Sequence, residues 1–197
     1  MGMTPICRAA IRGDAEIVSI LAPLVANPNA ACDNGVTPIW SAAFKGNAAI
    51  VKVLAPLVAN PNTAHAGFTP FVMAAPFGIA AIEGHLNVVK ILAPFIDDLN
   101  ASQSELRLSL IEMAIMKGHL EVIRYLYQFI DINEEHPIFY AICNRQPEPV
   151  KLLANLSKNL PTPLSNGGFT PIELAEELGA DEIVAILKTV EKAHSGC

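Results

Sequence analysis

Hydrophobic residues between positions 33 and 62 follow two helical patterns in succession. The first pattern consists of small apolar side chains at Ile39, Ala42 and Ala43. The second recurs at steps of three and four residues, with Lys52 on the opposite side, and its members are Ile50, Val53, Leu54 and Leu57. Apolar residues at this spacing occupy one face of an amphipathic helix. The segment therefore predicts two short helices that each bury one face.

Polar, proline and glycine residues mark where these two helices begin and end. Thr37 can cap the first helix with its hydroxyl, and Pro38 suits the first helical position because its missing N–H needs no partner there. Gly46 is the residue best able to take the left-handed conformation that ends a helix. Pro56 inside a helix would cost roughly 3 kcal/mol. The second helix is therefore predicted to stop or bend near Ala55.

The same unit recurs along the whole chain. Thr-Pro pairs begin at Thr4, Thr37, Thr69 and Thr170, and the first three are 33 and 32 residues apart. Segments 112–126 and 137–153 keep the helical frame without the threonine. Self-similarity at this period is typical of repeat architectures. We expect a single domain, residues 1–197, of six units at approximately 1–33, 34–66, 67–106, 107–133, 134–166 and 167–197.

Two of the units depart from the regular spacing. Pro70 lies 14 residues before Gly84, whereas the corresponding residues Pro38 and Gly46 are 8 apart. This difference predicts an insertion at Met73–Gly78 in the third unit. It either folds back over its neighbours or forms an exposed apolar patch for a partner. In the fourth unit the connection at Asp131–His136 is short, which predicts a shortened finger.

These motifs resemble the ankyrin repeat, whose signature is Thr-Pro-Leu-His-x-Ala, a Gly-His step, an Ile-Val-x-Leu-Leu helix and a hairpin with asparagine. The Gly-His helix is matched by GHLNVVKIL at 84–92 and GHLEVIRYL at 118–126, and the hairpin asparagine by Asn29, Asn62, Asn100 and Asn133. Trp40 replaces the family's histidine, and we expect it to pack in that place. The resemblance implies an all-α fold of helix-turn-helix repeats with short hairpin fingers, an ankyrin-repeat α-solenoid.

The resemblance also implies where a partner would bind. In ankyrin proteins two residues at the end of each first helix face a concave groove, and the hairpin tips touch partners. The groove positions here are Ile11, Arg12, Phe44, Lys45, Ile82, Glu83, Met116, Lys117 and Asn144. The candidate tip residues, each next to a threonine that begins a helix, are Val36, Phe68 and Phe169. The alternative for these side chains is an ordinary solvated face.

The outer end of the first unit carries several isoleucines where terminal repeats usually have a polar face. They are Ile6, Ile11, Ile17 and Ile20. Two explanations stay open. An end repeat tolerates this apolar surface, or the chain continues a longer protein or docks this end on another molecule.

Composition narrows the classes of partner and compartment. The formal net charge of −6 argues against nucleic acid, whose binding draws on clustered Lys and Arg, and favours a basic or neutral partner. No apolar run reaches the roughly 18 residues that suggest a membrane helix. The four cysteines lie far apart, at Cys7, Cys32, Cys143 and Cys197, a spacing that favours reduced thiols over zinc or a disulfide framework. We expect a cytoplasmic or nuclear protein.

Residues with catalytic chemistry do not form recognisable motifs. The five histidines show neither metal-ligand spacing nor a nucleophile nearby, and no glycine-rich phosphate loop occurs. His85 and His119 belong to the Gly-His step, where the resemblance implies a local structural hydrogen bond. We therefore expect no enzyme activity, no cofactor, no metal and no small-molecule substrate.

Two functional hypotheses follow. The first is a non-catalytic protein-protein interaction module, such as an adaptor, an inhibitor or a targeting domain. The alternative is a substrate of asparagine hydroxylation, or a regulatory or targeting segment of a larger enzyme or adaptor. In ankyrin proteins the hairpin asparagine can be hydroxylated, with a leucine eight residues before it. This sequence has that spacing at Leu21 and Asn29, Leu54 and Asn62, and Leu92 and Asn100.

Overall fold

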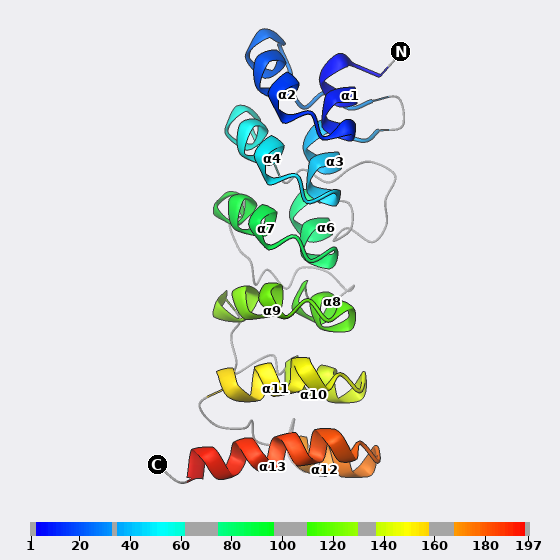
Figure 1. The fold of residues 1–197 in the computed structure, drawn as a ribbon, viewed down its shortest axis with the longest axis vertical. Coiled ribbons are helices and arrows are strands. Elements are labelled where there is room, and N and C mark those ends of the chain that lie inside the picture. Colours follow the sequence, from blue (N-terminus) through cyan, green and yellow to red (C-terminus); the bar gives the residue numbers. More distant parts are fainter. Residues whose placement is uncertain are drawn as a thin grey trace. The chain divides into compact units, whose positions relative to one another are not determined.

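The structure is a computed structural model that describes residues 3–32, 35–61, 75–96, 110–129, 137–157 and 168–195. Within these ranges every regular element is a helix, as Figure 1 shows, which confirms the predicted all-α fold. The chain divides into two compact units, Met1–Leu110 and Ile111–Cys197. No helix in the described ranges has both the length and the apolar character needed to cross a membrane.

The first unit contains three helix pairs arranged in two layers (Figure 1). One layer holds the first helix of each pair, with α3 in contact with both α1 and α6, and the other holds α4 in contact with both α2 and α7. Short 3-10 turns follow the second helices. The elements are α1 (Pro5–Arg12), α2 (Ala15–Leu21), η1 (Ala22–Leu24), α3 (Pro38–Phe44), α4 (Ala48–Leu54), η2 (Ala55–Leu57), α6 (Pro76–Ile82), α7 (Leu86–Leu92) and η3 (Ala93–Phe95).

The second unit repeats the layered arrangement. Helix α11 packs on both α9 and α13, while α10 packs on α12. Leu110, the first residue of α8, still belongs to the first unit. The elements are α8 (Leu110–Lys117), α9 (Leu120–Leu126), η4 (Tyr127–Phe129), α10 (Pro137–Cys143), α11 (Pro147–Leu156), α12 (Pro171–Glu177) and α13 (Asp181–Ser195).

The Thr-Pro pairs begin first helices, as the sequence predicts. The hydroxyl of Thr4 accepts a hydrogen bond from the Cys7 N–H at 3.2 Å, and that of Thr37 accepts one from the Trp40 N–H at 3.3 Å. In each case proline occupies the first helical position. This satisfies one backbone donor that the first turn of a helix leaves without a partner. Thr69 lies outside the described residues.

Proline ends the second helices of the first unit. Helix α4 stops at Leu54, and Pro56 lies in the 3-10 turn η2 that follows, which confirms the predicted stop at Ala55. The sequence wrongly assigned Leu57 to the buried face. Its side chain is 49% exposed because the chain has left the helix before this residue. Ile50 and Leu54, which precede the stop, are completely buried.

The predicted insertion at Met73–Gly78 is wrong for Pro76–Gly78. Pro76 is the first residue of α6 and stands eight residues before Gly84, the regular spacing, so Pro76–Gly78 is not inserted. Phe77 is buried in this helix. The sequence favoured Thr69-Pro70 as the helix start because it matches the other units. The extra residues therefore precede Ala75, and Met73 lies outside the described residues.

Most first helices end in a left-handed turn. Gly46 has a φ of 70°, which confirms the sequence prediction, and Arg145 takes the same conformation with a φ of 53°. Arg145 stands where the other units carry glycine. A side chain in this conformation costs roughly 1–2 kcal/mol, because its Cβ approaches the backbone carbonyl.

Two of the cysteines are paired, contrary to the expectation of free thiols. Cys7 in α1 and Cys32 in the finger before α3 form a disulfide, with Cα atoms 6.7 Å apart. Both side chains are buried. The residues are 25 positions apart in the sequence, and the fold brings them together because the finger turns back over the first helix. Cys143 is a free, exposed thiol.

Candidate partner-binding surface

The predicted groove residues occupy equivalent places at the ends of first helices. We call them the first-helix strip, which comprises Ile11, Arg12, Phe44, Lys45, Ile82, Glu83, Met116, Lys117 and Asn144. Each lies in the last turn of a first helix or directly after it. Equivalent positions in the stacked repeats of one compact unit form a continuous row. The first unit holds the strip residues from Ile11 to Glu83, and the second holds Met116, Lys117 and Asn144.

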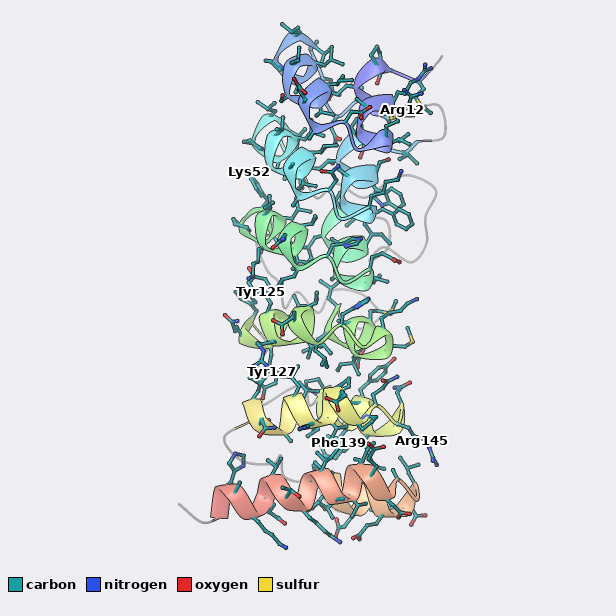
Figure 2. The ribbon with its side chains drawn as sticks, in the orientation of Figure 1. Arg12, Lys52, Tyr125, Tyr127, Phe139 and Arg145 are labelled. Atoms are coloured by element: carbon teal, nitrogen blue, oxygen red, sulfur yellow. A yellow bond between two sulfur atoms is a disulfide. The ribbon has the colours of Figure 1, made fainter. Side chains whose placement is uncertain are left out.

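The strip in the first unit combines an exposed aromatic ring with charged side chains. The Phe44 side chain is 43% exposed and stacks on Trp40, with ring centroids 5.4 Å apart and planes 5° from parallel. Trp40 itself is buried, as predicted for a packing residue. Arg12 (Figure 2) and Lys45 are exposed. Glu83 is also exposed, and Ile11 is half-buried. The stacked rings hold the exposed phenyl face in a fixed orientation.

Ile82 does not belong to the accessible strip. Its side chain is only 2% exposed, although the sequence placed it at the position equivalent to Phe44. Helix α6 has the sequence PFGIAAI, and all seven of its residues are buried. A helix that is apolar around its whole circumference is enclosed on every side. Ile82 is therefore part of the core.

The strip in the second unit has the same pairing of an apolar and a polar side chain. Met116 is 40% exposed, and the adjacent Lys117 is exposed. Asn144 is exposed as well, but its Nδ2 donates to the backbone oxygen of Tyr140 at 2.9 Å. This contact occupies one of its two amide hydrogens. Met116 and Lys117 are thus the strip residues of this unit most available to a partner.

The predicted finger residues differ in exposure. Phe169 is 51% exposed directly before α12, which agrees with a projecting position. Val36 is half-buried, and its backbone oxygen accepts from the Cys32 N–H at 2.9 Å within the finger turn. Phe68 lies outside the described residues. Phe169 is the finger aromatic whose accessibility the structure establishes.

Side chains of one repeat bind backbone oxygens at the end of the neighbouring first helix. The Nζ of Lys45 donates to the Ile11 oxygen, and the Nε2 of His85 donates to the Phe44 oxygen at 3.0 Å. The last carbonyls of a helix have no donor within the helix, so these contacts satisfy them. His85 therefore has a structural role, but its hydrogen bond reaches the preceding repeat and is not the local one that the sequence predicted.

The second unit contains a contact of the same kind, in which the side chain donates to the following repeat instead of the preceding one. Arg145 projects from the turn after α10 (Figure 2) and its guanidinium donates to the Leu178 oxygen at 2.6 Å. Cations near a helix C-terminus also interact favourably with the helix dipole. Tyr127 adds a side-chain hydrogen bond to Ser157 at 3.0 Å, between the second helical segments of adjacent repeats.

Metal-ligand geometry is absent from the described part of the chain. No group of three or more His, Cys, Asp or Glu side chains gathers there in a way that could hold a metal ion. The Nε2 of His85 is engaged with the backbone oxygen of Phe44, a residue of the strip. The chemistry displayed by the strip is that of a contact surface, with aromatic, thioether, cationic and carboxylate groups.

Sequence reasoning overlooked one exposed cation. Arg8 lies one turn before Arg12 on α1, and both side chains line an open cleft of about 280 Å³ at the outer end of the first unit. The four-residue spacing of the two arginines is the signal that could have revealed it, since residues at this spacing share a helix face.

Comparison with known proteins gives a consistent result. The family model for ankyrin repeats matches residues 1–65 and 111–194 in three copies. Among curated proteins, no sequence matches the chain. The fold is similar to the ankyrin repeat domain of human ASB11, with a TM-score of 0.68 and 23% identity over 95% of this chain and 83% of that one.

Two further solved structures share the fold. The ankyrin repeat domain of Bcl-3, a member of the IkappaB family, has a TM-score of 0.71 and 17% identity over 95% of this chain and 86% of that one. An ankyrin repeat domain from Acinetobacter baumannii AYE has a TM-score of 0.67 and 22% identity over 94% of this chain and 97% of that one.

Proposed function

Because the chain belongs to the ankyrin-repeat family, whose repeats generally act as protein-protein interaction modules, we propose that it binds a partner protein through the first-helix strip. In this role the chain is a non-catalytic adaptor, inhibitor or targeting domain. Phe169 on the finger before α12 extends the contact surface. Ile82 takes no part, because it is buried.

The observation that carries this proposal is the repeated pairing of a large apolar side chain with a lysine. Phe44 and Lys45 form such a pair in the first unit, and Met116 and Lys117 form one in the second. The two apolar side chains are 43% and 40% exposed. Aromatic residues and methionine are enriched in protein interfaces, where they serve as anchors. The lysines would set orientation through complementary charge.

Quantitative capture from a native lysate of the source cells tests the proposal. The test variant carries Phe44→Ala, Lys45→Ala, Met116→Ala and Lys117→Ala. Its matched control makes the same kinds of change at exposed positions away from the strip, namely Leu24→Ala, Lys52→Ala, Leu57→Ala and Lys151→Ala. Circular dichroism first establishes that both variants keep their helical content.

The result expected is loss of a protein from the strip variant that the wild type and the control variant retain. The captured protein is then tested as a purified partner by titration calorimetry against the same three chains. Equal retention by all three would refute the strip as the binding site and direct attention to Phe169.

Hydroxylation of the hairpin asparagine is the alternative. Asn29 is half-buried, and its Oδ1 accepts from the Ile39 N–H at 3.0 Å, so the finger has to open before an enzyme can reach it. Asn62 and Asn100 lie outside the described residues. Intact-mass analysis after incubation with an asparagine hydroxylase tests this route, and a mass increase of one oxygen atom is the result that supports it.

A further inference from the structure

The outer end of the first unit is the open face of a repeat that elsewhere is covered. Arg8 corresponds to Ser41 in the next repeat, because the two lie at the same distance from Thr4 and Thr37. Ser41 is 5% exposed. Lys45, four residues later and directly after α3, donates to the Ile11 oxygen, so this face of α3 is turned toward α1. The matching face of α1 carries Arg8 and is solvent-exposed.

The second helices also have a residue that is exposed in the first repeat and buried at the equivalent position of the next repeat. Ile17 in α2 corresponds to Ile50 in α4. Ile50 is completely buried, one turn after Asn47, whose Nδ2 donates to the Gly13 oxygen of the preceding repeat at 3.2 Å. Ile17 is 47% exposed. Ile20, three residues later on α2, is 57% exposed. Within the described residues, the side chains at this end that correspond to an internal interface are exposed.

The sequence correctly placed Ile17 and Ile20 on this end but was wrong about Ile6. Its side chain is 2% exposed and belongs to the core. The surface beside the two exposed isoleucines is charged, because Arg8 and Arg12 line the cleft together with Met3 and Asp14. We call this surface, comprising Met3, Arg8, Arg12, Asp14, Ile17 and Ile20, the end face. It combines a basic side on α1 with an aliphatic side on α2.

The charge of the end face is opposite to that of the whole chain. Two arginines and one aspartate line the cleft, whereas the chain carries a formal net charge of −6. Neither guanidinium has a hydrogen bond or an ion pair with a residue in the described ranges. Arginine presents a planar fork that matches a carboxylate through two parallel hydrogen bonds. The carboxylates of an acidic ligand would give both guanidinium groups a hydrogen-bonding partner.

We propose that the end face binds an amphipathic helix of another protein, with glutamate or aspartate side chains over Arg8 and Arg12 and aliphatic side chains over Ile17 and Ile20. A helix fits because the equivalent surfaces of α3 and α4 are themselves covered by the helices α1 and α2. Helix-in-groove recognition of this kind uses anchors at three- and four-residue spacing. The end face is separate from the first-helix strip except for Arg12, which belongs to both.

The probe is a fluorescein-labelled helical peptide with leucine along one face and glutamate at the flanking positions. A second peptide replaces every glutamate by lysine. Fluorescence anisotropy measures both against the wild type, against the double variant Arg8→Glu and Arg12→Glu, against Ile17→Glu, and against Lys52→Glu. Lys52 is an exposed cation of the same unit that points away from the cleft (Figure 2), so Lys52→Glu controls for total charge.

We expect the wild type and Lys52→Glu to bind the acidic peptide at least about tenfold more tightly than the lysine peptide, with a preference that shrinks as salt rises. The double variant should reverse the preference, and Ile17→Glu should bind the acidic peptide at least about tenfold more weakly than the wild type does. All these substitutions are at exposed positions, and a thermal melt verifies folding.

Three outcomes would overturn the proposal. The first is equal binding of the two peptides by the wild type. The second is an unchanged preference in the double variant. The third is concentration-dependent dimerisation of the wild type alone that Ile17→Glu abolishes in sedimentation velocity, because the occupant of the end face would then be a second copy of this chain.

Discussion

Gly46 follows α3, which ends at Phe44, and lies against the imidazole of His85. A Cβ added to this glycine would lie 2.5–2.8 Å from three atoms of the ring, and its φ of 70° already disfavours a side chain. We expect Gly46→Ala to destabilise the chain by about 2–5 kcal/mol, the sum of left-handed strain and overpacking. Urea unfolding followed by circular dichroism measures the loss.

Gly179 provides the matched control for this substitution. It has a φ of 62° and no atom within 4 Å of its added Cβ. Gly179→Ala should therefore cost only the backbone strain, roughly 1–2 kcal/mol. Combining Gly46→Ala with His85→Ala should restore part of the lost stability, because the imidazole is then absent. Equal losses of stability in Gly46→Ala and Gly179→Ala would show that the His85 imidazole moves aside without an energetic cost.

At the residue scale, local backbone chemistry was predictable and burial between distant segments was not. The cap at Thr37 and the left-handed turn at Gly46 follow from short local motifs. The burial of Ile82 depends on what surrounds α6 in three dimensions. The pairing of Cys7 with Cys32 likewise depends on a finger folding back over a helix, which residue spacing alone does not reveal.

At the scale of the element, α12 begins with a reciprocal capping box. The N–H and the hydroxyl of Thr170 both donate to the Oε2 of Glu173, at 2.8 and 2.9 Å. The Glu173 N–H donates in return to the Thr170 hydroxyl oxygen. The backbone hydrogen bond first, and the hydroxyl second, hold the pKa of Glu173 below its ordinary value of 4.5.

A lowered carboxyl pKa stabilises the folded state only while the carboxylate is charged. The contribution of Glu173 should be complete above pH 4.5 and disappear as pH falls through its lowered folded-state pKa. Carboxyl NMR titration should place the Glu173 midpoint below 4.5. As pH falls, the Glu173→Gln variant should lose less folding stability than the wild type, because it has no carboxylate to protonate at this position. A midpoint at or above 4.5 would contradict the capping box as the controlling interaction.

Pro56 determines where α4 ends. Its substitution shows whether the proline fits the turn after the helix or strains the helix end. Since Pro56 lies in an exposed 3-10 turn, Pro56→Ala should destabilise the chain by less than about 1 kcal/mol, through greater freedom of the unfolded chain. Lys52→Pro, inside the same helix, should cost about 3 kcal/mol or more. Urea unfolding compares the two. A stabilising Pro56→Ala would mean that the proline strains the helix end.

Element boundaries were predictable wherever capping residues had one interpretation. The third unit offered two proline starts. The Thr-Pro match favoured Pro70, which lies outside the described residues, whereas the helix that precedes Gly84 begins at Pro76. The helix begins at Pro76 because the spacing to Gly84 and the apolar sequence that follows fit the layer of first helices.

At the scale of the whole molecule, stability should be distributed along the stack. Leu187 in α13 is completely buried, so Leu187→Ala should cost about 2–5 kcal/mol. In a repeat protein each repeat contacts only its neighbours, so the loss should be local. Hydrogen exchange should show reduced protection in α10–α13 and unchanged protection in α1–α4. A uniform loss across the chain would indicate a single cooperative unit instead.

The hydrogen bonds between repeats of the first unit have a consequence for how such a chain can evolve. Lys45, Asn47 and His85 each supply the donor from a side chain, whereas the acceptor in the preceding repeat is a backbone oxygen. Every residue type carries that oxygen. A repeat that is duplicated, lost or exchanged by recombination therefore meets a usable acceptor in any neighbour, and the receiving positions are free to diverge without breaking the junction.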